Sequence, residues 1–115
     1  MRSIFKRAAV LALASTAGSA ASAQPAAWPT PGKTIQIIVP APGGGGTGDT
    51  IARIVADELA KTLKTSVIVD NKPGANGNIG AAAAAMSDPD GYRLLFSWAG
   101  TLAVNPNLYK KLSFD

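Results

Sequence analysis

The sequence contains no cysteine and no histidine, and both absences limit its chemistry. Without cysteine there is no disulfide framework, no thiol nucleophile and no cysteine-based zinc site. Without histidine the chain lacks the commonest general base and metal ligand. No two carboxylates are spaced for acid and base catalysis, and no nucleophile has a visible base beside it in the sequence. Any catalysis would therefore have to rest on Asp, Glu, Lys, Tyr or backbone groups, and we expect no metal and no organic cofactor.

Most of the net positive charge lies in the first residues of the chain. Residues 1–7 carry three basic side chains, and an apolar run over residues 8–13 and small residues ending at Ala23 follow them. This order is typical of a secretory signal peptide. The apolar run is much shorter than the ~20 residues of a membrane span. We expect residues 1–23 to be a signal peptide that is cut after Ala23, so that the protein is periplasmic.

The rest of the chain is nearly neutral. The formal net charge of +4 falls to +1 once residues 1–23 are set aside, because residues 24–115 carry eight basic and seven acidic side chains. A nucleic-acid partner or direct attachment to an anionic membrane would call for a stronger positive charge. We therefore expect no nucleic-acid partner and no direct membrane anchor.

Patterns typical of strands and helices alternate after a proline-rich lead-in at residues 24–33. The predicted elements, in order, are a buried strand at 34–39, a helix at 49–64, a buried strand at 66–69, a helix at 79–86 and a strand at 92–96. This order and the short connections favour the α/β class, with a parallel sheet and helices on its faces. Three strands leave two exposed sheet edges, so we expect residues 34–115 to be part of a larger domain.

Three segments rich in glycine and small polar residues follow the predicted strands, at residues 40–49, 70–78 and 97–101. The carboxyl ends of parallel strands share one edge of the sheet, where helix N-termini offer free N–H groups and a positive dipole end. The four glycines of the first segment are suited to wrapping a carboxylate in backbone N–H groups. A flexible turn is the simpler interpretation of the same glycines.

The first segment also contains the pattern G-x-G-x-x-G, at Gly43, Gly45 and Gly48, with Asp70 after the next strand. Enzymes that bind dinucleotides use this arrangement. Against it, Asp49 would face the pyrophosphate, and four consecutive glycines produce the pattern easily. A P-loop is excluded because no Lys-Ser or Lys-Thr follows the glycines. A Rossmann-type dinucleotide-binding enzyme domain remains the alternative to a carboxylate-binding domain.

Several side chains near these segments have two possible roles. We expect Asp49 to cap the helix that it begins, although it could also fix the glycine loop. Asn76 and Asn78 suit either turns or hydrogen bonds to a ligand. Thr101 suits a helix cap or a hydroxyl donor to a ligand, and Trp98 is a candidate to line a cleft.

Taken together, the sequence resembles the substrate-binding receptors of tripartite tricarboxylate transporters, also called Bug receptors. The matching motifs are IVP at 38–40 with the glycine loop and DTIAR at 49–53, VDNKPGANGNIG at 69–80, DPDGY at 88–92 and GTLAVNPNLY at 100–109. The resemblance implies an exported bacterial receptor, not an enzyme, with two α/β domains that close over a small organic carboxylate. Such a receptor delivers its solute to a membrane permease. The chain would then be the first part of domain one of a two-domain periplasmic binding protein.

The resemblance also implies a binding site. In the family, the loops after the first and third strands grip the carboxylate, partly through backbone groups and bridging waters, and the loop before the second helix adjoins them. The corresponding residues of this sequence are Ala41, Pro42, Gly43, Gly44, Gly45, Gly46, Thr47, Asn76, Gly77, Asn78, Ala99, Gly100 and Thr101.

Two features depart from the family pattern. Ala41 stands where an aromatic residue is usual, and the glycine loop is one residue longer before Asp49. We expect these changes to alter the cleft or to weaken binding. Members of the family continue into a second domain, so we expect an N-terminal fragment, with a truncated product without function as a further alternative.

Overall fold

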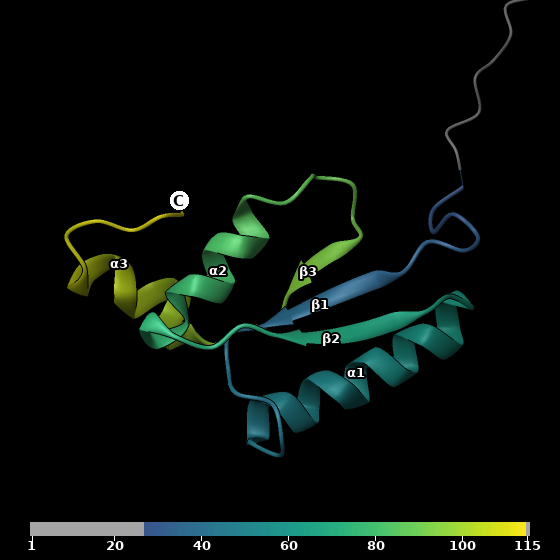
Figure 1. The fold of residues 1–115 in the computed structure, drawn as a ribbon, viewed down its shortest axis with the longest axis horizontal. Coiled ribbons are helices and arrows are strands. Elements are labelled where there is room, and N and C mark those ends of the chain that lie inside the picture. Colours follow the sequence, from purple (N-terminus) through teal and green to yellow (C-terminus); the bar gives the residue numbers. More distant parts are fainter. Residues whose placement is uncertain (1–26, 115) are drawn as a thin grey trace, which may run out of the picture.

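The computed structural model describes residues 27–114, so the expected signal peptide and most of the stretch before Trp28 lie outside the described residues. A small sheet lies between two helices, α1 on one face and α2 on the other (Figure 1). The elements, in order, are β1 Ile35–Val39, α1 Thr47–Leu63, β2 Val67–Asn71, the 3₁₀ turn η1 Ala75–Gly77, α2 Asn78–Ala85, β3 Arg93–Leu95, the π-helical turn η2 Gly100–Val104 and α3 Asn105–Leu108.

The sheet has the strand order β2-β1-β3, and both pairs of neighbours are parallel. Ile37, at the middle of β1, pairs with Val69 of β2 on one side and with Leu94 of β3 on the other. This topology confirms the predicted α/β class with a parallel sheet and flanking helices. It also explains why β1 is the most apolar strand, since a central strand with a helix on each face is shielded from water on all sides.

The prediction that the second strand is buried was wrong for one of its faces. Val67 and Val69 pack against the core under α1, but Ile68, between them, is 48% exposed. Successive side chains of a strand point to opposite faces, and α2 covers β1 and β3 without covering β2. The continuous apolar run therefore overstates the burial of an edge strand.

Small residues let both helices lie close to the sheet. Ala52 and Ala56 of α1 pack directly on Ile37 and Val39, and all four side chains are buried. Burying an isoleucine or valine side chain contributes about 1.5–3 kcal/mol each, so this contact is a main source of stability. On the opposite face, Gly80 of α2 approaches so closely that an added Cβ would lie 2.8 Å from Pro40 Cβ.

The start of α1 differs from the prediction. The helix begins at Thr47, two residues before the predicted start, and its N-cap is Gly46, which makes no side-chain capping hydrogen bond. Asp49 lies in the first turn and is not the cap. The N–H groups of the first helical turn have no carbonyl one turn earlier to bind, so this end of α1 lacks the usual side-chain acceptor.

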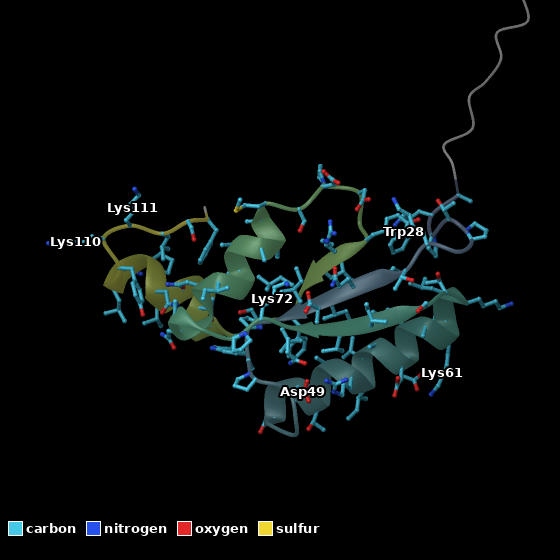
Figure 2. All side chains as sticks on the ribbon, viewed as in Figure 1. Trp28, Asp49, Lys61, Lys72, Lys110 and Lys111 are labelled. Carbon is cyan, nitrogen blue, oxygen red and sulfur yellow. The ribbon has the colours of Figure 1, made fainter. Side chains whose placement is uncertain are left out.

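The lead-in precedes β1 at the amino end of the sheet, and Trp28 lies apart from Asp49 (Figure 2). Trp28 packs on Tyr92 with ring centroids 5.9 Å apart, and the Thr30 N–H donates to the Tyr92 hydroxyl at 2.6 Å. Lys33 forms an ion pair with Asp90 at 3.0 Å. These contacts leave the carboxyl edge of the sheet free for the loops that follow the strands.

Candidate functional site

The three predicted loops leave the sheet at its carboxyl edge and lie side by side (Figure 1). Just beyond the strands, the Lys72 N–H donates to the Val39 carbonyl at 2.8 Å, and the Phe96 N–H donates to the Ile38 carbonyl at 3.0 Å. Sequence-distant segments are therefore fixed next to one another. In open parallel sheets this edge is the usual place for ligands.

The first loop presents its backbone to solvent. Pro42, the four glycines at 43–46 and Thr47 are exposed, whereas Ala41 is half-buried against the core. Gly44 and Gly45 have φ values of +106° and +111°, a conformation that glycine adopts without a steric penalty. The loop runs directly into the uncapped start of α1. This combination of open backbone and positive helix end suits an anion.

Asp49 holds the first loop in place through hydrogen bonds. Its buried carboxylate accepts the Gly44 N–H at 3.2 Å, the Asn71 amide at 3.0 Å, and the Arg53 Nε and Nη2 at 3.0 Å each. The Arg53 guanidinium and then the Asn71 amide hold the pKa of Asp49 well below its usual range, and Asp49 in turn raises the pKa of Arg53. The ion pair offsets the negative charge beside the helix end, so Asp49 does not oppose an anionic ligand.

Asn71, at the end of β2, joins the first loop to the sheet. Besides its bond to Asp49, its amide donates to the Ala41 carbonyl at 3.1 Å. Its Oδ1 accepts from Arg53 at 3.2 Å and would lie 2.9 Å from a Cβ on Gly43. A side chain at position 43 would therefore displace the Asn71 amide from its present position. Our sequence analysis did not select Asn71, although its place at a strand end beside the glycine loop was a usable signal.

The second and third loops are joined by a network of polar side chains, of which Asn78, Thr101 and Asn105 are buried. The Asn105 amide donates to the Asn76 carbonyl at 3.0 Å and to Asn78 Oδ1 at 2.6 Å, and Asn105 Oδ1 accepts from the Asn76 amide at 2.8 Å. Thr101 Oγ1 donates to the same Asn76 carbonyl at 3.3 Å. Thr101 and Asn105 are fully buried.

The structure does not give Thr101 the predicted helix-cap role, and its predicted contact with a ligand stays a prediction. Its hydroxyl neither caps a helix nor faces solvent, because it is bound inside the protein between η1 and η2. Gly77 and Asn78 are also buried, while Asn76 and Ala99 are exposed and Gly100 is half-buried. The sequence analysis did not single out Asn105 as a site residue.

Trp98, in the third loop, lies against the first turn of α1. A Cβ on Gly48 would be 3.6 Å from Trp98 Cζ3, and one on Gly100 would be 3.2 Å from Trp98 Cδ1. The indole is 39% exposed, and its predicted place at the side of a cleft stays a prediction. The ring thus lies beside the first turn of α1, at Gly48, and beside Gly100 of its own loop.

Residues 27–114 also bear on metal binding, on a second pocket and on membrane crossing. In this part of the chain, no cluster of three acidic side chains is placed to hold a metal ion. A shallow pocket of about 360 Å³ lies between Ala75, Asn78, Tyr109 and the segment 111–113, away from the glycine loop. None of the helices formed by these described residues is long and apolar enough to cross a membrane.

The chain is similar to known proteins in both sequence and fold. The family described as "Tripartite tricarboxylate transporter family receptor" matches residues 51–115. A UPF0065 protein of Bordetella bronchiseptica is 42% identical over 109 residues, which are 95% of this chain and 32% of that protein.

Two solved structures from Rhodopseudomonas palustris are also similar. MatC (Rpa3494), with bound malate, is 35% identical with a TM-score of 0.68 over 74% of this chain and 29% of MatC. Rpa4515, with adipate, is 32% identical with a TM-score of 0.68 over 77% of this chain and 29% of Rpa4515.

The family match covers more than half of the sequence, so the chain belongs to the tripartite tricarboxylate transporter receptor family. The resemblance to Bug receptors is thereby confirmed, and a solved relative is itself described as the periplasmic binding protein BugD. The chain spans about a third of the length of the relatives that it matches. Family membership favours a solute receptor over the dinucleotide-binding alternative.

Proposed function

We propose that the chain forms part of a periplasmic receptor that binds a small organic carboxylate for a tripartite tricarboxylate-type transporter. The observation that carries the proposal is the meeting of three loops at one sheet edge, around a helix start that no side chain caps. The malate and adipate in the titles of two solved relatives support a carboxylate, and in particular a dicarboxylate, as the ligand class. A signal peptide at residues 1–23 would bring the protein to the periplasm.

In this proposal the carboxylate lies over the first loop and the start of α1. The exposed segment 43–47 supplies backbone N–H groups, except that of Gly44, which is donated to Asp49. Ala99 and Gly100 of the third loop lie on the other side of the ligand, near Trp98. The positive end of α1 adds a favourable field for a negative charge. Residues 76–78 and Thr101, whose polar groups are bound to one another, shape the neighbouring wall. Closure of a second domain over the solute and delivery to a membrane permease complete the proposed cycle.

The proposal is tested by calorimetric titration of the full product of the gene with malate, adipate, citrate, glutamate and NAD. We expect saturable binding of one or more of the carboxylates and no heat with NAD. Tight NAD binding without a response to any carboxylate would favour the dinucleotide-binding alternative. Absence of binding to all five compounds would contradict the proposed ligand class.

A charge substitution tests whether the carboxylate lies at the start of α1. Thr47→Asp adds a carboxylate at the first residue of α1, where Asp stabilises the helix but repels an anion. We expect unchanged or higher thermal stability together with at least tenfold weaker carboxylate binding. Thr62→Asp is the matched control, because it changes the net charge equally at an exposed position near the other end of α1. Equal loss of affinity in both variants would show that overall charge, and not the first loop, is responsible.

A further inference from the structure

The turn before α2 has an unusual backbone. Ala75, Asn76 and Gly77 are three successive residues with positive φ, at +48°, +54° and +91°. Glycine adopts such values readily and asparagine does so occasionally, but an alanine in the left-handed region is sterically disfavoured. Residues held in this region persist where the surrounding structure enforces them, and they cluster at ligand sites. The turn therefore requires contacts that hold it in place.

Asn105 supplies most of those contacts from a distant part of the chain. It is fully buried at the start of α3, and one of its amide hydrogens is donated to the Asn76 carbonyl at 3.0 Å while the other goes to Asn78 Oδ1 at 2.6 Å. Its oxygen accepts from the Asn76 side chain at 2.8 Å. Both amide hydrogens and the oxygen of the Asn105 side chain are thus used in hydrogen bonds to Asn76 and Asn78. Thr101 adds the second bond to the Asn76 carbonyl, and a Cβ on Gly77 would overlap Thr101 Oγ1.

We propose that Asn105 is a positioning residue for the ligand site, which holds the left-handed turn 75–77 and fixes the second loop against the third. This inference rests on the proposed function of the chain as a carboxylate receptor. The chemistry of the side chain is specific, because the contact needs two donors and one acceptor in one short planar group. An ionised aspartate has the same shape but only acceptors, and it would face the Asn76 carbonyl and Asn78 Oδ1.

The test compares Asn105→Asp with Asn107→Asp in the full product of the gene. Both changes add one negative charge to α3, but Asn107 is exposed and donates only to the Ala103 carbonyl within its own helical segment, at 2.9 Å. With malate as the probe, or adipate if that binds more tightly, we expect Asn105→Asp to raise the Kd at least tenfold at unchanged stoichiometry. Asn107→Asp should stay within twofold of the parent.

Stoichiometry separates positioning from a purely structural role. A variant that only destabilises the fold would lower the number of sites per chain and leave the Kd of the folded molecules unchanged. Equal Kd values for Asn105→Asp and its parent would therefore overturn the proposal, and so would equal losses in both variants. If Asn105→Asp does not fold, Thr101→Val removes one bond to the Asn76 carbonyl with little change of shape, and a Kd increase of about threefold is expected. No change in Kd would overturn the proposal.

Hydrogen exchange gives a readout that does not depend on any ligand. The Gly77 N–H donates to the Gly74 carbonyl at 2.9 Å, and the Asn78 N–H donates to the Ala75 carbonyl. Asn105→Asp should speed exchange at these two amides at least tenfold and leave the amides in the middle of α1 unchanged. Unchanged exchange at Gly77 and Asn78 would refute the positioning role. If exchange responds as expected while the parent binds no carboxylate, the proposed function fails and the structural part of the inference stands.

Discussion

Substitution of Gly80 by alanine tests the close approach of α2 to the end of β1. Gly80 is buried in α2, and a Cβ there would lie 2.8 Å from Pro40 Cβ and 3.0 Å from both Pro40 Cα and the Lys72 carbonyl oxygen. Carbon atoms pack best at about 3.5–4.0 Å, so the helix would have to move by roughly 1 Å. The atoms in the way belong to a proline ring and to backbone, which cannot rotate aside.

Two opposing effects decide the sign of the change. Alanine in the middle of a helix is more favourable than glycine by about 0.8–1 kcal/mol. Extra volume in a packed region costs about 1–3 kcal/mol, and the rigid neighbours of Gly80 favour the upper half of that range. We therefore expect Gly80→Ala to lower the free energy of unfolding by about 1–2 kcal/mol.

Gly48→Ala is the matched control. Gly48 also lies in a helix without a positive φ, but its added Cβ would meet Trp98 at the ordinary distance of 3.6 Å. This variant should be unchanged or up to about 1 kcal/mol more stable. The measurement is urea unfolding of both variants and the parent, followed by circular dichroism, with the midpoint compared at constant slope. A Gly80→Ala midpoint equal to or above that of Gly48→Ala would refute the close approach.

Two further predictions concern the core and the acid response. Ile37→Ala should lower the free energy of unfolding by about 2–5 kcal/mol in the same urea assay, because it empties the buried centre of β1; a loss below about 1 kcal/mol would contradict its place in the core. The pKa of Asp49 is lower in the folded protein than its ordinary value of 3.8, so its ionised form adds stability above that value, which is lost as the pH falls through the folded pKa. Stability measured from about pH 6 down to the most acidic pH that the protein tolerates should therefore fall less steeply in Asp49→Asn than in the parent. Parallel pH profiles would show that the ion pair with Arg53 does not form.

Local patterns were sufficient to predict the three strands, α1 and α2, but not η1, η2 and α3. Three local patterns were enough: the β-branched run of β1, the 3.6-residue spacing of α1 and the alanine run of α2. Each of these elements is determined mainly by residues that are close together in the sequence. The start of α1 was harder to predict, because Asp49 is a favoured N-cap residue and its role in binding Arg53 and Asn71 depends on tertiary contacts. The exposure of Ile68 likewise depends on which strand lies at the edge.

The loops of the candidate site could be predicted, but not how they are held. Glycines after a strand and before a helix indicated an anion site, and parallel topology placed the loops at one edge. Asn105 contacts Asn78 and Asn76, which precede it by 27 and 29 positions in the sequence. No local spacing pattern encodes a pairing over such a distance. The same limit applies to Thr101, whose hydroxyl suited a ligand as well as the Asn76 carbonyl that it binds.

The central claim is that backbone N–H groups at the carboxyl edge of this sheet bind a carboxylate. A crystal structure of the full gene product with bound malate, or with whichever of the titrated carboxylates binds most tightly, tests it directly. We predict carboxylate oxygens within about 3.2 Å of backbone nitrogens of the segment 43–47, beside Trp98. A ligand that is bound elsewhere, with that segment in contact only with water, would contradict the claim.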